Sequence, residues 1–153
     1  MRELSEVDIV GVVGAGTMGN GIAQVAATAG YDVVMRDVEG EYVERGLDSI
    51  EDSLDRLAGK DALDEEPEEI RDRIAGTTDL DDLADADLAV EAVVEDLDVK
   101  RDVFADLDRV TDDGVVLATN TSTLSITTIA SATDRASDVV GLHFMNPVPI
   151  MDG

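Results

Sequence analysis

Three glycines with the spacing of a phosphate-binding turn are the clearest chemical signal in the sequence. Gly14, Gly16 and Gly19 come directly after an apolar, β-branched stretch and before a run of small, helix-forming residues. Glycine permits a tight turn at the first position, close approach of the backbone to a pyrophosphate at the second, and close packing of helix on strand at the third. The N–H groups at the start of such a helix attract phosphate. The pattern predicts a nucleotide-binding loop, which also includes Ala15, Thr17 and Met18.

An acidic residue follows the next predicted strand. Residues 31–36 have the apolar character of a strand, and Asp37 comes directly after them. A carboxylate about 20 residues past such glycines accepts hydrogen bonds from a ribose 2′-hydroxyl and repels a 2′-phosphate. Arg36 could favour NADP, but its side chain should leave the strand on the face opposite Asp37. The pattern therefore predicts NAD as the cofactor, with a ligand-free α/β domain as the alternative.

Two further polar side chains follow predicted strands. Ser122 comes after the apolar run 114–118, and His143 comes after 139–142. Histidine exchanges a proton near neutral pH, so beside a nicotinamide it could accept the proton of a hydroxyl group whose carbon gives up hydride. Two structural interpretations stay open, because Ser122 could cap a helix and His143 could be an ordinary strand-end residue.

Predicted strands alternate with predicted helices along the whole chain. Strands are expected at residues 7–13, 31–36, 75–78, 87–94, 114–118 and 139–142. Helices are expected from residue 20, at 39–57, 64–74 and 96–110, and weakly through 126 and 129. A short acidic helix or loop is expected at 79–84, and a polar turn at 119–122. This alternation predicts an α/β fold with a Rossmann-type, doubly wound, mostly parallel sheet that has helices on both faces and binds ligands beyond the carboxyl ends of its strands.

The composition bounds the kind of protein. The 153 residues predict one domain, and the absence of cysteine excludes disulfides and thiolate metal sites. A single histidine excludes a multi-histidine metal centre, so no metal is expected. The N-terminus lacks the apolar region of a signal peptide, and no apolar run is long enough to cross a bilayer. We therefore expect a soluble, cytoplasmic protein.

The charge balance is unusual. The sequence has 36 acidic residues against 11 Lys and Arg, for a formal net charge of -25, which argues against nucleic acid and anionic membranes as partners. Hydrophobic residues make up 44% of the chain, which argues against disorder. The basic residues are nearly all arginine, since only Lys60 and Lys100 are lysine. We interpret the acidic surface as an adaptation to high salt, and predict a halophilic source.

Four motifs, taken in order, resemble those of L-3-hydroxyacyl-CoA dehydrogenases. They are Gly-x-Gly-x-Met-Gly-x-Gly-Ile-Ala at 14–23, Val-Glu-Ala-Val-Val-Glu at 90–95, Asn-Thr-Ser at 120–122 and His-Phe-Met-Asn-Pro-Val-Pro at 143–149. The resemblance covers nearly the whole chain, and its last motif is far more specific than its first. It implies the NAD-binding domain of an enzyme that reversibly oxidises 3-hydroxyacyl-CoA to 3-oxoacyl-CoA, in fatty-acid β-oxidation or butanoate metabolism.

The resemblance also implies roles for individual residues. It makes His143 the catalytic base, and it places Ser122 against both the substrate oxygen and the cofactor. Further contacts to NAD are implied for Glu95, Lys100 and Asn146. Contacts to coenzyme A are implied for Ser53 and Lys60. Both lysines of this lysine-poor chain thus match positions that meet an anionic ligand, for which an ammonium group is suited.

The chain also departs from the family. Family members continue into a helical C-terminal domain that closes the acyl site and forms a homodimer, and they place beyond Gly153 a Glu that orients the catalytic imidazole. We therefore expect residues 1–153 to form the NAD-binding domain alone, with weak activity or none. The alternatives are a non-catalytic module that binds NAD or acyl-CoA, and a dehydrogenase of another small hydroxy acid.

Overall fold

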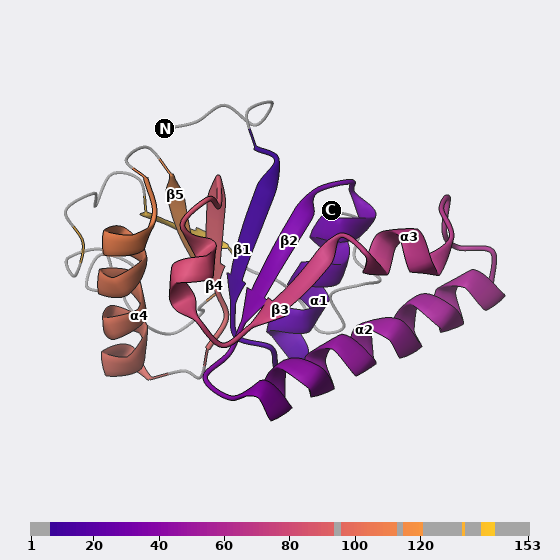
Figure 1. Cartoon of the computed structure of the whole chain (residues 1–153), viewed down its shortest axis with the longest axis horizontal. Helices are drawn as coiled ribbons and strands as arrows, with labels where there is room; N and C mark the ends of the chain where they lie inside the picture. The colour runs from indigo at the N-terminus through magenta and orange to yellow at the C-terminus, as the bar shows by residue number, and fades with distance from the viewer. Residues whose placement is uncertain (1–6, 94–95, 113–114, 121–132, 134–138, 143–153) are drawn as a thin grey trace.

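A six-stranded parallel sheet forms the centre of the part of the chain that the structure describes (Figure 1). The structure is a computed structural model, and it describes residues 7–93, 96–112, 115–120, 133 and 139–142. The strand order is β3-β2-β1-β4-β5-β6, and each neighbouring pair is parallel. The strands are β1 Ile9–Val13, β2 Asp32–Arg36, β3 Ile74–Thr77, β4 Leu88–Glu91, β5 Val116–Asn120 and β6 Val139–Leu142.

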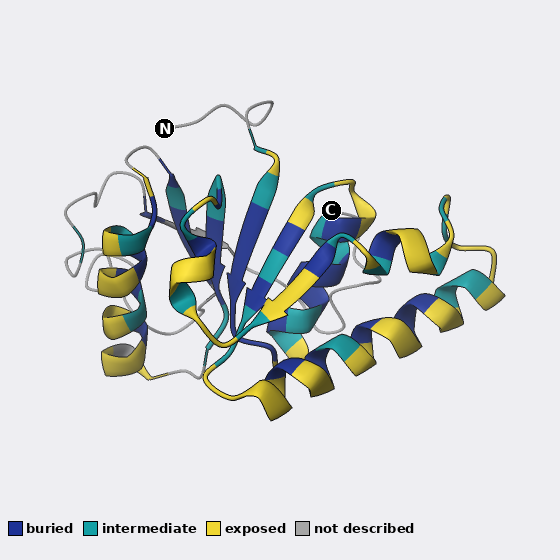
Figure 2. Ribbon diagram, in the orientation of Figure 1, coloured by how far each residue is buried: buried dark blue, intermediate teal, exposed yellow. Residues whose placement is uncertain are grey.

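Helices cover both faces of this sheet. Helices α1 (Thr17–Thr28), α2 (Gly40–Gly59) and α3 (Pro67–Arg71) pack with one face, in an apolar cluster that includes residues of β1 and β2. Helix α4 (Leu97–Val110) and the short 3-10 helix η2 (Leu80–Leu83) pack in a second cluster, which includes residues of β5. The inward side of each helix is buried and the outward side is exposed (Figure 2). No helix in the described ranges has both the length and the apolar character needed to cross a bilayer.

The strand order confirms the predicted Rossmann-type fold. From β1 the chain first moves outward to β2 and β3, and it then crosses back to β4 on the other side of β1. Ligands of such sheets bind at this reversal, outside the carboxyl ends of the two central strands. The loop that follows β1 and the residues that follow β4 therefore flank the expected site.

Two predicted boundaries were wrong for identifiable reasons. Thr119 was expected in a polar turn, but it lies in β5, where its hydroxyl donates a buried hydrogen bond to Glu91 on the neighbouring strand. Ile74 was expected to end a helix, but it is buried as the first residue of β3 and pairs with Val33. The predicted weak helix through residues 126 and 129 lies outside the described residues.

Candidate functional site

The glycine loop is shaped by contacts that only glycine permits. Gly14 has a φ of 114°, and a Cβ atom there would lie 2.6 Å from the carbonyl oxygen of Ala92. A Cβ at Gly19 would lie 1.8 Å from the carbonyl oxygen of Gly14, so helix α1 could not pack against the loop with any larger residue. The predicted turn at Gly14 and the close helix packing at Gly19 are both confirmed.

The middle glycine leaves space for a ligand. Gly16 is exposed and is the N-cap of α1, where no side chain caps the helix. A Cβ at Gly16 would meet no atom of the protein within 4 Å. The backbone at the start of α1 is therefore open to an anion, as a pyrophosphate site requires. Thr17 and Met18 form the first turn of the helix.

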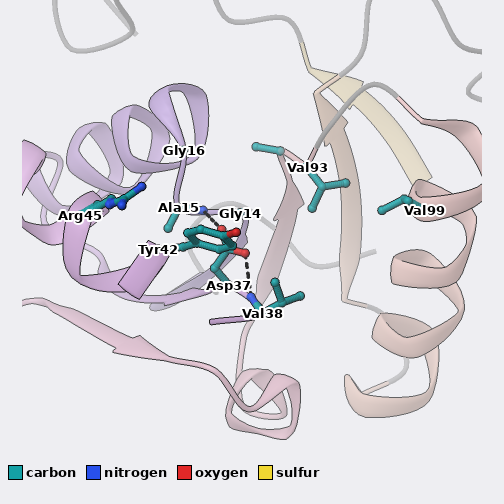
Figure 3. A pocket seen from close by; sticks show the side chains of 10 residues that line it. Gly14, Ala15, Gly16, Asp37, Val38, Tyr42, Arg45, Val93 and Val99 are labelled. Carbon is teal, nitrogen blue, oxygen red and sulfur yellow. Dashed lines mark hydrogen bonds between the residues drawn. The ribbon is translucent and has the colours of Figure 1, made fainter. Parts of the chain in front are cut away.

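The structure brings Asp37 onto this loop. One carboxylate oxygen, Oδ2, accepts a hydrogen bond of 2.9 Å from the backbone N–H of Ala15, 22 residues earlier in the chain. The other oxygen, Oδ1, accepts one of 2.7 Å from the N–H of Val38 (Figure 3). Arg36 turns away, since its Nε donates to the carbonyl oxygen of Thr78. The predicted meeting of the acidic residue with the glycine loop is thus present in the structure.

A cavity of about 530 Å³ opens beside this contact. The glycine loop and the start of α2 form one side of it, and the residues after β4 with the first turn of α4 form the other (Figure 3). Its lining residues are Gly14, Ala15, Gly16, Asp37, Val38, Tyr42, Arg45, Ala92, Val93 and Val99. The cavity therefore lies at the reversal in strand order, where the fold predicts a ligand.

The rim of this cavity exposes apolar side chains. Val38, Tyr42 and Val99 are the large hydrophobic residues recorded as exposed in the described ranges, at 64%, 41% and 39%. All three line the cavity. Exposed apolar groups that gather at one place mark a binding surface rather than a random surface.

Arg45 is the one cationic residue among the described residues that line the cavity. Its guanidinium pairs with Glu41 one helical turn earlier, at 2.5 Å, and both side chains are largely exposed. Helix α2 passes close to the glycine loop at Gly46. A Cβ atom added there would lie only 2.7 Å from the carbonyl oxygen of Ala15. Sequence reasoning missed Arg45 and Tyr42. Both residues fall in the first two turns of the predicted helix 39–57, which begins just after Asp37, and this position could have indicated that they lie near the cofactor site.

Lys100, for which an NAD contact was predicted, is fully buried in the structure. Its Nζ donates a 2.7 Å hydrogen bond to Oε2 of Glu91, which is also fully buried, and it does not line the cavity. Glu91 was not among the predicted site residues. The direct contact of Lys100 with NAD stays a prediction.

The two residues with a predicted coenzyme A contact lie along α2, outside the cavity. Ser53 is buried, and its hydroxyl accepts a 3.0 Å hydrogen bond from Nε2 of Gln24 on α1. Lys60 is exposed at the C-cap of α2. The structure does not bring these two residues to the glycine loop, and their contact with coenzyme A stays a prediction.

Four predicted site residues lie outside the described residues: Glu95, Ser122, His143 and Asn146. The strands that lead toward two of them are described, and Asn120 of β5 pairs with Leu142 of β6. Both strands are parallel to β4, so they end at the same edge of the sheet as the cavity. No cluster of metal-binding side chains occurs in the described part of the chain.

Comparison with known proteins identifies the relatives of this chain. Residues 9–152 match the family described as the NAD-binding domain of 3-hydroxyacyl-CoA dehydrogenase. A probable 3-hydroxybutyryl-CoA dehydrogenase of Deinococcus radiodurans is 50% identical over 141 residues, which cover 92% of this chain and 51% of that protein. The human mitochondrial hydroxyacyl-coenzyme A dehydrogenase is 44% identical over 149 residues, which cover 93% of this chain and 48% of that protein.

Solved structures give the same result. The crystal structure of (S)-3-hydroxybutyryl-CoA dehydrogenase from Ralstonia eutropha superposes with a TM-score of 0.92 at 44% sequence identity. The match covers 95% of this chain and 52% of that one. The chain thus spans about half the length of the relatives that it matches.

Proposed function

The chain belongs to the 3-hydroxyacyl-CoA dehydrogenase family, as its NAD-binding domain, and from this premise we propose that it serves the reversible oxidation of a 3-hydroxyacyl-CoA to the 3-oxoacyl-CoA. NAD is the cofactor that this family of domains binds. The observation that carries the proposal is the 2.9 Å hydrogen bond from Ala15 to Asp37, because it places an acidic side chain beside the glycine loop and at the cavity.

The shape and chemistry of the cavity support a dinucleotide. The open backbone at Gly16 and the start of α1 suit the diphosphate. The carboxylate of Asp37 suits the hydroxyl groups of the adenosine ribose. Beyond the ribose, the exposed side chains of Val38, Tyr42 and Val99 on the rim of the cavity suit the adenine ring.

The chemistry then needs two groups of the chain near the cofactor. When bound, NAD supplies the hydride acceptor for the substrate carbon that carries the hydroxyl group. We expect the imidazole of His143 to accept the hydroxyl proton at the same time, and the hydroxyl of Ser122 to donate a hydrogen bond to the same oxygen. Both assignments come from the motif resemblance.

We assign the acyl-CoA substrate by the same reasoning. The relatives named above act, by their names, on hydroxyacyl-coenzyme A or 3-hydroxybutyryl-CoA. Lys60 is an exposed cation at the C-cap of α2 that could meet the phosphates of coenzyme A, and Ser53 lies about two helical turns before it. A location in the cytoplasm, a family-type homodimer and the absence of nucleic-acid or membrane partners stay predictions.

Titrations followed by an assay test the proposal. The 153-residue chain is titrated with NAD, NADP and acetoacetyl-CoA by calorimetry, and oxidation of NADH by acetoacetyl-CoA is then followed by absorbance. We expect NAD to bind more tightly than NADP, and His143→Gln to remove any turnover while leaving NAD affinity nearly unchanged. Binding of both ligands without turnover would instead favour a non-catalytic module. Failure to bind NAD would refute the proposal.

A further inference from the structure

Two side chains of opposite charge line the cavity on the side formed by the glycine loop and α2. Asp37 directly follows β2, and Arg45 lies in the second turn of α2 (Figure 3). Beside an adenosine ribose, a carboxylate accepts hydrogen bonds from the hydroxyl groups and repels a 2′-phosphate, whereas a guanidinium binds the phosphate. Asp37 therefore favours NAD, and a guanidinium available at Arg45 would favour NADP.

The two charged residues are positioned by the same residue of the glycine loop, Ala15. Its backbone N–H donates a 2.9 Å hydrogen bond to Oδ2 of Asp37. Its carbonyl oxygen lies against Gly46, the residue after Arg45, where an added Cβ would come within 2.7 Å. Asp37 and the segment of α2 that carries Arg45 thus meet at one point of the loop, so a group bound beside Asp37 lies near Arg45 as well.

A carboxylate on α2 pairs with this arginine. Oε1 of Glu41 accepts a 2.5 Å hydrogen bond from Nη2 of Arg45. A glutamate four residues before a cation is the favourable order for an ion pair on a helix. Glu41 also lies in the first turn of α2, where the helix dipole stabilises a negative charge. Both effects hold the carboxylate of Glu41 beside Arg45.

This pair makes Arg45 a poorer ligand for phosphate. A guanidinium that donates to a carboxylate has fewer N–H groups to offer, and its charge is largely cancelled for an approaching anion. Both side chains are largely exposed, so the pair contributes little to folding stability. Its removal should therefore change ligand binding without unfolding the domain.

We propose that Glu41 is a second determinant of cofactor choice, because its pairing with Arg45 withholds from a 2′-phosphate the cation that would favour NADP. The proposal rests on the proposed function, since it needs the cavity to hold the adenosine ribose. Asp37 acts on the ribose directly. Glu41 does not line the cavity, so it is a positioning residue that acts through Arg45.

A double-mutant cycle tests this role. The variants are Glu41→Gln, Arg45→Met and the double variant. Glu44→Gln is the matched control, because it removes the same charge from an exposed position of α2, and adjacent residues on a helix do not face each other. Each protein is titrated with NAD by calorimetry, and with NADP directly or by competition against NAD. Two KCl concentrations are used, at which circular dichroism shows every variant folded.

The quantity measured is the Kd for NADP divided by the Kd for NAD. In Glu41→Gln we expect this ratio to fall roughly twofold to fivefold, because the released Arg45 can meet the 2′-phosphate. The fall should be smaller at the higher KCl concentration, since salt screens this attraction. The double variant should return to the wild-type ratio, because it replaces a neutral pair with two neutral side chains. Glu44→Gln should also keep the wild-type ratio.

Several results would overturn the proposal. A wild-type ratio in Glu41→Gln, or no detectable NADP binding by that variant, would show that the pair does not restrain Arg45. An equal fall in the double variant would show that Glu41 repels the phosphate directly, and an equal fall in Glu44→Gln would show a general effect of charge. A wild-type chain that binds NAD while the ratio stays unmoved refutes this proposal alone. Failure of the wild-type chain to bind NAD would refute the proposed function.

Discussion

Replacing Asp37 by alanine is the most direct test of how the cavity chooses its cofactor. The carboxylate stands at the cavity with its two oxygens already oriented by the N–H groups of Ala15 and Val38, at 2.9 and 2.7 Å. A fixed carboxylate offers its remaining lone pairs to the ribose hydroxyl groups at little entropic cost. A hydrogen bond to a charged group contributes about 1.5–3 kcal/mol, which corresponds to a loss of roughly tenfold to 150-fold in NAD affinity.

Asp37→Ala should also reduce the preference for NAD over NADP, because the charge that repels a 2′-phosphate is removed. Calorimetric titration of both cofactors into wild type and variant measures both effects. Asp48→Ala is the matched control, since it removes the same charge from an exposed position of α2 that does not line the cavity. An unchanged NAD affinity in Asp37→Ala, or a wild-type chain that binds NADP at least as tightly as NAD, would refute the assignment of Asp37.

Three further predictions concern charge. Arg45→Met should weaken NAD binding by roughly twofold to fivefold, as expected for the loss of one exposed cation near a phosphate. A calorimetric titration in which the variant binds NAD as tightly as wild type would contradict this. Thermal melts across a KCl series should show a midpoint that rises with salt, because screening shortens repulsion among the 36 acidic residues; a flat or falling midpoint would remove the high-salt interpretation. The hydrogen bond from Arg73 holds the pKa of Glu65 below its ordinary value of 4.5. Its stabilising effect is therefore complete above that value and lost as the pH falls through the lowered pKa, so wild type and Glu65→Gln should differ in melting midpoint at pH 6 and converge in acid.

The glycine loop and its acidic partner could be predicted from the sequence because backbone geometry dictates both. A parallel strand order places the ends of β1 and β2 side by side, so a residue just after β2 must lie near the loop after β1. The alternation of side chains along β2 likewise predicted that Arg36 and Asp37 diverge. These inferences needed no knowledge of side-chain packing.

The exposed apolar rim of the cavity could not be predicted in this way. Periodicity identified the buried face of α2, where Val43, Ile50 and Leu54 are indeed buried. It says nothing about which residues beside that stripe stay exposed next to a loop from elsewhere in the chain. Tyr42 and Val99 belong to this class, since they lie on different helices and both line the cavity.

Lys100 shows where a stricter use of periodicity would have changed the interpretation. Lys100, Phe104 and Leu107 follow one another at spacings of four and three residues, which places them on one face of α4, and all three are buried. A lysine within such an apolar stripe requires a buried acceptor, because an unpaired ammonium group is far too costly in the interior. The candidate acceptor was visible in Glu91, the only charged residue of β4. The sequence thus contained both partners of the buried ion pair that the structure shows between α4 and β4.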